Sequence, residues 1–223
     1  MDYRDLNEKT IKNRYPLTLI KETLMLLSMA RYLTKLGIKG AQNLIRMAMG
    51  DKWKMELRTQ YRVFKDLVIP FGMTNAPATF WTYINETLSV YLARVCFAFL
   101  DDTIVYSMAL EEHIVHIRQI LKRLLISYVG LHLNPKKCAF HQTENTYLGL
   151  TIGRQGIRMQ AEKVQAIQDW KTPSNLSEVH YFYGFENFYR RFIHDFFTTI
   201  RPLAELTRKH QYFHCNKDET AYL

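Results

Sequence analysis

The stretch Val95-Cys-Phe-Ala-Phe-Leu-Asp-Asp-Thr-Ile-Val-Tyr106 is the most informative part of this sequence. Two short apolar runs flank an acidic pair, Asp101 and Asp102. This apolar, acidic, apolar pattern predicts a β-hairpin whose tight turn presents two carboxylates. Placing charge inside an apolar segment costs free energy unless the charge meets a partner. The pair therefore indicates either a divalent metal site or an acidic dipeptide that simply occupies an exposed turn.

Helical and strand-like patterns alternate around this hairpin. The expected helices cover residues 17–29, 78–92 and 111–128, and a further helical, aromatic region follows residue 173. The expected strands cover residues 32–36 and 44–47, with a glycine-containing turn at 37–40 between them, and residues 58–69 are expected to form another strand or a hairpin arm. Strands that alternate with helices before a mostly helical tail predict an α+β domain with a helical appendage.

The 223-residue chain is basic, with a formal net charge of +9. Residues 1–70 contain 14 Lys and Arg against 7 acidic residues, so most of the excess positive charge lies in the first third. Such a segment favours a polyanionic partner, because neutralised phosphates release counterions. A solvated basic face without a ligand explains the charge equally well. Composition therefore raises nucleic acid as a partner without establishing it.

Composition also argues against several protein classes. The longest apolar stretch, residues 95–100, is far shorter than the roughly 20 residues that span a bilayer, so we expect no membrane protein. The N-terminus carries no apolar signal core, so we expect an intracellular location, cytoplasmic or nuclear. The three cysteines are widely separated and indicate reduced thiols. His113 and His116 have no third metal ligand nearby, and we expect them at the surface.

In a basic protein, paired carboxylates at a β-turn suggest metal chemistry on phosphates. Two Mg²⁺ ions about 3.5 to 4 Å apart can stabilise the attacking and leaving oxygens of a phosphoryl transfer. Mg²⁺ is usually held by a few carboxylates together with substrate phosphates. Asp101 and Asp102 are therefore the candidate catalytic and metal-ligating residues, with Mg²⁺ or Mn²⁺ as the expected cofactor.

The hairpin resembles the metal-binding turn of reverse transcriptases from gypsy-type LTR retrotransposons. In that family an aromatic residue, any residue and two aspartates precede a strand, as Phe99 to Asp102 precede Ile104 to Ser107 here. Other segments resemble further landmarks of the family in the family's order: Asp2-Tyr-Arg, Asn13-Arg-Tyr-Pro16, Trp53-Lys54, Arg58-Thr59, Pro70-Phe-Gly-Met-Thr-Asn-Ala-Pro-Ala-Thr-Phe80, Leu133-Asn-Pro-Lys-Lys-Cys138, Tyr147-Leu-Gly149 and Phe188-Tyr-Arg-Arg-Phe-Ile193. Chance would not place so many motifs in one order.

This resemblance implies a right-hand polymerase palm, an antiparallel sheet backed by helices, with partial fingers and a helical thumb or connection segment. The implied division is residues 1–80 for the partial fingers and first palm segment, 81–152 for the palm with the acidic turn, and 153–223 for the thumb side. An RNA/DNA hybrid or duplex is the implied partner. The residues implied to contact nucleotide or template are Gln42, Lys54, Arg58, Phe71, Gly72, Asn75 and Pro77.

The sequence departs from the family at one decisive position. The family's third carboxylate lies on the strand before the acidic turn, and Gly37 takes its place here. No acid occurs between Glu22 and Asp51. Glycine offers no carboxylate to bridge two ions, so we expect weakly held metal and a loss of rate on the order of a thousandfold or more. The family's sugar-pocket aromatic is replaced by Gln42.

Three functions are therefore open, and whether the chain is an enzyme is uncertain. The first is a catalytically defective reverse-transcriptase-like domain that still binds nucleic acid. The second is a weakly active RNA-directed DNA polymerase, completed by Glu22, Asp51 or a partner's acid. The third is a co-opted protein-interaction module that uses the aromatic residues of 181–193, although core packing explains these aromatics better. A dimer with a complete reverse transcriptase subunit is also open.

Overall fold

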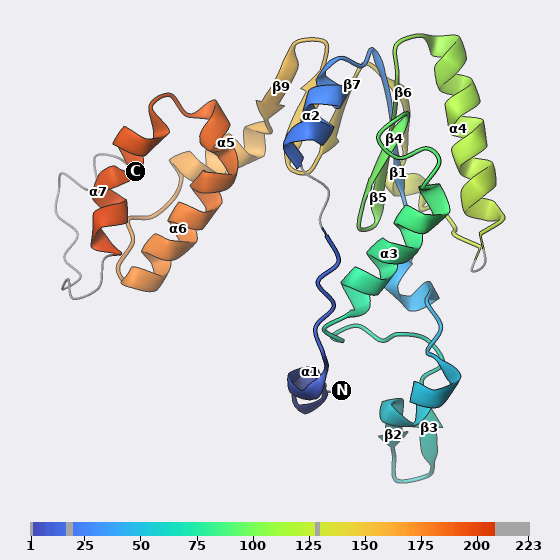
Figure 1. The fold of residues 1–223 in the computed structure, drawn as a ribbon. Coiled ribbons are helices and arrows are strands. Elements are labelled where there is room, and N and C mark those ends of the chain that lie inside the picture. The colour runs from blue at the N-terminus through green and yellow to red at the C-terminus, as the bar shows by residue number, and fades with distance from the viewer. Residues whose placement is uncertain (1, 17–19, 128–129, 208–223) are drawn as a thin grey trace. The chain divides into compact units, whose positions relative to one another are not determined.

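The structure, a computed structural model, describes residues 2–16, 20–127 and 130–207. The helices are α1 (Arg4–Lys9), α2 (Ile20–Ser28), α3 (Ala76–Leu88), α4 (Leu110–Leu125), α5 (Ala161–Gln168), α6 (Leu176–Tyr189) and α7 (Phe196–Leu206), with 3-10 turns η1 (Ala41–Leu44), η2 (Met49–Met55), η3 (Pro135–Lys137) and η4 (Arg190–Phe192). The strands are β1 (Tyr32–Gly37), β2 (Glu56–Arg58), β3 (Val63–Lys65), β4 (Cys96–Phe99), β5 (Asp102–Ser107), β6 (Ala139–Gln142), β7 (Glu144–Tyr147), β8 (Leu150–Gly153) and β9 (Gly156–Met159) (Figure 1). This is the predicted α+β architecture.

The chain divides into two compact units. The first comprises Met1–Tyr147 and Ile152–Gly156, and the second comprises Leu148–Thr151 and Ile157–Leu223. Strands β7, β8 and β9 form a three-stranded sheet that the sequence patterns did not predict. No helix in the described part of the chain is long and apolar enough to cross a membrane.

A four-stranded sheet in the order β4-β5-β1-β6 is the centre of the first unit. Strands β4 and β5 pair from Cys96 to Phe99, and Phe99 lies opposite Asp102. Leu100 and Asp101 are therefore the two turn residues, and the φ of 50° at Leu100 fits the first position of a type II′ turn. The hairpin predicted from the sequence, with its two carboxylates at the turn, is confirmed.

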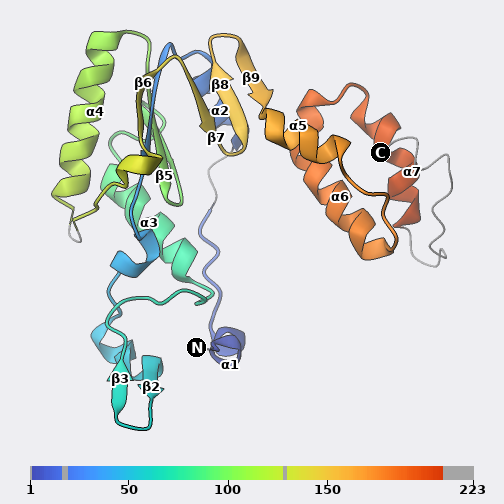
Figure 2. The ribbon, with the colours of Figure 1, turned by 180° about the vertical axis from the view of Figure 1, so that it is seen from behind.

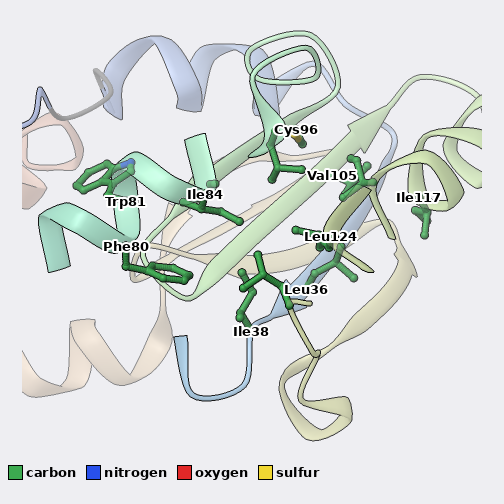
Figure 3. Packing of buried hydrophobic residues seen from close by; sticks show 13 residues of the cluster. Leu36, Ile38, Phe80, Trp81, Ile84, Cys96, Val105, Ile117 and Leu124 are labelled. Carbon is green, nitrogen blue, oxygen red and sulfur yellow. The ribbon is translucent and has the colours of Figure 1, made fainter. Parts of the chain in front are cut away.

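The hydrophobic core lies between this sheet and helices α3 and α4. Both helices cover the same side of the sheet (Figures 1 and 2). Figure 3 shows the packing of the buried cluster, which comprises Leu36, Ile38, Phe80, Trp81, Ile84, Leu88, Cys96, Ala98, Val105, Ile117, Ile120, Leu124 and Leu131. Spacings of three and four place the α3 and α4 members of this cluster on one face of each helix. The two amphipathic helices predicted here are confirmed.

The opposite face of the sheet carries the acidic end of β5. Side chains alternate along a strand, so Leu36 and Val105 face the helices whereas Gly37 and Asp102 face the other side. Leu33 and Ile104 on this second face are fully buried. Helix α2 lies on this side (Figures 1 and 2) and covers part of it. Asp101 and Asp102, at the turn end of the sheet, are partly exposed.

The predicted strand over 44–47 is wrong. Residues before and after it form the 3-10 turns η1 and η2, and only a single bridge joins Arg46 to Val68. Asn43 N donates to Gly40 O at 3.0 Å, which closes a turn where an extended strand would have to begin. Residues 58–69, expected to be a strand or a hairpin arm, contain β3, which pairs with β2 as one arm of a short hairpin whose strand residues are all exposed.

The second unit contains a small helical core. Phe182 of α6 is buried together with Val179, and both pack with buried residues of α7. Asn175 caps α6, since its Oδ1 accepts a hydrogen bond of 2.9 Å from Glu178 N. Tyr181 remains 78% exposed, so the aromatics after residue 173 divide between the core and the surface.

Candidate functional site

The acidic turn lies beside β1, and a lysine of β1 reaches it. Asp102 is opposite Gly37, and Lys35 lies two residues earlier on the same face. Lys35 Nζ is 2.8 Å from Asp102 Oδ2, with the two side chains 22% and 33% exposed. A lysine ammonium group therefore offsets the cost of placing this carboxylate in an apolar hairpin.

Asp101 is held at the turn by the backbone and by its electrostatic surroundings. Its carbonyl accepts a hydrogen bond of 2.8 Å from Ile38 N, directly after Gly37. Burial raises the pKa of the Asp101 carboxyl, the charge of Lys137 lowers it and the charge of Asp102 raises it. The net effect is a raised pKa for Asp101, whereas Asp102 has Lys35 as its ion-pair partner.

Gly37 has no space for a side chain. A Cβ built on Gly37 would overlap Lys137 Cβ and would lie 3.3 Å from Lys137 Cδ and from the Lys137 carbonyl oxygen. The Gly37 carbonyl accepts a hydrogen bond of 2.8 Å from Asn134 N, so the segment before η3 is fixed to β1. The space that a side chain at Gly37 would need is therefore filled by atoms of Lys137.

The side chains at the turn do not fit a pair of magnesium ions. Among the described residues, no three His, Cys, Asp or Glu side chains are grouped where they could hold a metal ion. Asp51, one candidate replacement, forms an ion pair with Lys54 in η2, and Glu22, the other, is exposed on α2. Two Mg²⁺ ions need several oxygen ligands, whereas the turn offers two carboxylates, one of them bound to Lys35.

Four of the seven candidate nucleotide or template residues lie together at the start of α3. Phe71 is exposed in the turn before the helix, and Pro77 lies in its first turn. The Gly72 carbonyl accepts a hydrogen bond of 2.7 Å from Asn7 Nδ2. A φ of 97° at Gly72 is a backbone conformation that favours glycine.

Asn75 has a structural task that the sequence did not reveal. Its Oδ1 accepts from Asn13 N at 2.9 Å, and its Nδ2 donates to the Ile11 carbonyl at 2.8 Å. The side chain therefore fastens the N-terminal segment to the loop before α3. These two bonds use one of the two Nδ2 hydrogens and one of the two Oδ1 lone pairs, so the amide can still contact a ligand without breaking either bond.

The other three candidates belong to η1, to η2 and to the β2-β3 ribbon. Arg58 ends β2 and is exposed on the two-stranded ribbon, which Figures 1 and 2 show apart from the four-stranded sheet. Lys54 is exposed in η2, where it pairs with Asp51 and lies 5.8 Å from the centre of the Trp53 ring. Gln42 belongs to η1, and its side chain lies outside the described residues.

The expectation of a surface position is wrong for His113. This side chain is fully buried, with Nε2 2.9 Å from Thr34 Oγ1 and Nδ1 2.9 Å from Ser107 Oγ. Ser107 Oγ is also 2.8 Å from Nδ1 of His116, which is half-buried. Burial, together with the charges of His141 and His116, lowers the pKa of His113 to about 4. His113 lies four residues before the buried Ile117, so helical spacing could have revealed its burial.

An antiparallel sheet with an acidic β-turn, backed on one side by two helices, is the palm of a right-hand polymerase. Residues 1–152 match the family model for Reverse transcriptase (RNA-dependent DNA polymerase). The chain belongs to this family, whose domains generally use divalent metal ions.

Relatives of the chain occur within transposon polyproteins. The chain is 34% identical over 209 residues to the Transposon Tf2-3 polyprotein and 33% identical over 209 residues to the Transposon Tf2-7 polyprotein, both of Schizosaccharomyces pombe. In each case 94% of the chain is matched, and the chain spans 16% of the polyprotein.

Solved structures with the same fold include the foamy viral protease-reverse transcriptase. Its complex with double-stranded DNA matches with a TM-score of 0.87 at 23% identity, covering 99% of this chain and 39% of the viral chain. Its complex with an RNA/DNA hybrid matches with a TM-score of 0.82 at 23% identity, covering 99% and 30%. The fold of a reverse transcriptase polymerase domain is thus shared over nearly all of this chain.

Proposed function

We propose that this reverse transcriptase domain binds an RNA/DNA hybrid or duplex and is strongly impaired in nucleotidyl transfer. The observation that carries the proposal is Gly37, which lies opposite Asp102 at the position where the family supplies a third carboxylate. In this proposal residues 1–80 form partial fingers and the first palm segment, 81–152 complete the palm, and 153–223 form the thumb side.

The acidic turn still has the side chains for weak metal binding. Asp101 and Asp102 would hold a single Mg²⁺ or Mn²⁺ loosely, because one carboxylate is already paired with Lys35. Nucleotidyl transfer that relies on two ions loses several kcal/mol of transition-state stabilisation without the bridging ligand, which corresponds to about a thousandfold or more in rate. The ancestral chemistry would therefore be slow or absent.

Binding of nucleic acid does not depend on the missing carboxylate. The β2-β3 ribbon exposes Arg58 and Arg62 beside Tyr61 and Phe64, which are 83% and 49% exposed. Arginine neutralises phosphates, and exposed aromatic rings can stack on bases. Relatives of the same fold are seen in complex with double-stranded DNA and with an RNA/DNA hybrid, which supports the same class of partner here.

Primer extension tests the catalytic part of the proposal. Purified protein is incubated with RNA or DNA template, primer, nucleotides and either Mg²⁺ or Mn²⁺, and a double variant, Asp101→Asn with Asp102→Asn, sets the background. We expect extension no greater than this background. Clear incorporation that the double variant abolishes would overturn the proposal and establish a working polymerase. Activity that requires an added complete reverse transcriptase subunit would indicate a dimer instead.

Fluorescence anisotropy with a labelled hybrid tests the binding part. We expect the affinity to fall steeply between about 50 and 200 mM salt, and Arg58→Gln with Arg62→Gln to weaken binding and flatten that dependence. Arg201→Gln is the matched control, because Arg201 is exposed in the second unit and paired with Glu205. An affinity that does not change with salt would contradict this part.

A further inference from the structure

We propose that Lys35 is the resident counterion of the acidic turn, and that Lys137 closes the position from which a metal-bridging carboxylate would project. The inference deepens the proposed function, because it explains why the turn cannot regain a metal pair by restoring one side chain. It concerns metal binding and stability of the free protein, so it is tested without nucleic acid or nucleotides.

The segment that carries Lys137 is fixed to the end of β1 and to the residues that follow it. Lys39 N donates to the His132 carbonyl at 2.8 Å, and Asn134 N donates to the Gly37 carbonyl at 2.8 Å. Lys137 N in turn donates to the Asn134 carbonyl at 2.9 Å, which closes the η3 turn. The backbone of Lys137 is therefore held in place by a continuous set of hydrogen bonds that begins on β1 itself.

The overlap at Gly37 cannot be relieved by rotating the lysine. The position of a Cβ atom is set by the backbone, whereas side-chain torsions move only the atoms beyond it. Because a Cβ at position 37 would overlap Lys137 Cβ, any residue larger than glycine must displace η3 or break its bonds to β1. Gly37 lies in β1 and has no positive φ, so space and not backbone conformation requires glycine here.

Lys35 also supplies part of the positive charge that a metal would bring. Its Nζ forms a 2.8 Å ion pair with Asp102. A divalent ion entering the turn would have to displace or repel this ammonium group, which weakens its binding.

Three variants separate the shape of position 137 from its charge. Gly37→Asp restores the carboxylate, and it is combined either with Lys137→Ala or with Lys137→Gly. Both substitutions at 137 remove the same charge, but only glycine removes the Cβ that blocks position 37. The closest remaining contact would be the carbonyl oxygen at 3.3 Å, which a small shift accommodates. Mn²⁺ binding is measured by electron paramagnetic resonance, and stability by thermal unfolding.

We expect two variants, Gly37→Asp alone and Gly37→Asp combined with Lys137→Ala, to have a melting temperature several degrees lower than the wild type. Neither should bind Mn²⁺ more tightly than the wild type. With Lys137→Gly we expect Mn²⁺ to bind at least about tenfold tighter than in the Lys137→Ala pair. The inference would be overturned by a Gly37→Asp variant that has the melting temperature of the wild type and binds Mn²⁺ tightly. Equal Mn²⁺ affinity in the two double variants would overturn it as well.

A single substitution at Lys35 tests the counterion role without changing Gly37. Lys35→Met in the wild-type chain should raise the Mn²⁺ affinity several-fold, because the Asp102 carboxylate loses its resident cation. Unchanged affinity would overturn the counterion role. Wild-type protein that holds two Mn²⁺ ions tightly yet fails to extend primers would overturn this inference and leave the proposed function standing. Primer extension by wild-type protein that binds Mn²⁺ weakly would overturn the proposed function and leave this inference standing.

Discussion

The two ends of the β1-β5 strand pair differ in how their polar side chains are used. At one end, His113 is buried between Thr34 and Ser107 and contacts hydroxyl groups of both strands. At the other end, Gly37 lacks a side chain and the ion pair of Asp102 is partly exposed. The comparison teaches that the polar side chains of this strand pair are buried and hydrogen-bonded to one another at one end and partly exposed at the other. The apolar core, which includes Leu36 and Ile38, continues to the turn end and does not depend on a side chain at Gly37.

The largest expected effect is at the buried end. His113→Ala should lower the free energy of unfolding by about 2–4 kcal/mol, because it opens a cavity and leaves the hydroxyls of Thr34 and Ser107 without their partner. Urea unfolding measures the change. His194→Ala, at a side chain that is 95% exposed, should change little and is the control. If His113→Ala lowers the free energy of unfolding by less than about 1 kcal/mol, the two ends of the β1-β5 strand pair do not differ in how much they stabilise the fold.

Low pH should lower the free energy of unfolding through His113, at the same end of the β1-β5 strand pair. The pKa of His113 is lowered from 6.5 to about 4 in the folded chain, so the fold favours the neutral ring. Stability from this group is complete above pH 6.5 and is lost as the pH falls toward 4, by about 3 kcal/mol at most. Unfolding free energies of wild type and His113→Gln, compared between these pH values, isolate this part from the carboxylates. A difference that stays constant with pH would contradict the prediction.

At the turn end, adding a single carbon should have a smaller effect. Gly37→Ala places a Cβ against Lys137 Cβ and should destabilise the chain by about 1–3 kcal/mol through overpacking. Gly50→Ala is the matched control, because a Cβ at Gly50 would meet nothing within 4 Å. Chemical denaturation measures the free energy of unfolding of both variants. If both variants are equally stable, Gly37 is not required by the space around it.

Local sequence patterns predicted the elements whose structure depends mainly on residues that are close together in the sequence. The apolar runs around Asp101 and Asp102 predicted the hairpin, and helical spacing predicted α3 and α4, because each pattern lies within a single element. Lys35 could also have been found, since strand alternation places it on the same face as Gly37. Lys137 could not, because it reaches Gly37 from about 100 residues later, through a turn that only the folded chain brings there.

The smallest expected effect concerns the charge of the turn itself. Asp102→Asn should change the free energy of unfolding by about 1 kcal/mol or less, because a partly exposed ion pair is screened by water and salt. Asparagine keeps the shape of aspartate and can still accept a hydrogen bond from Lys35. Urea unfolding at low and high salt measures the change, with Lys35→Met as the reciprocal variant. A loss as large as that of His113→Ala would mean that the acidic turn, and not the buried histidine, stabilises this strand pair.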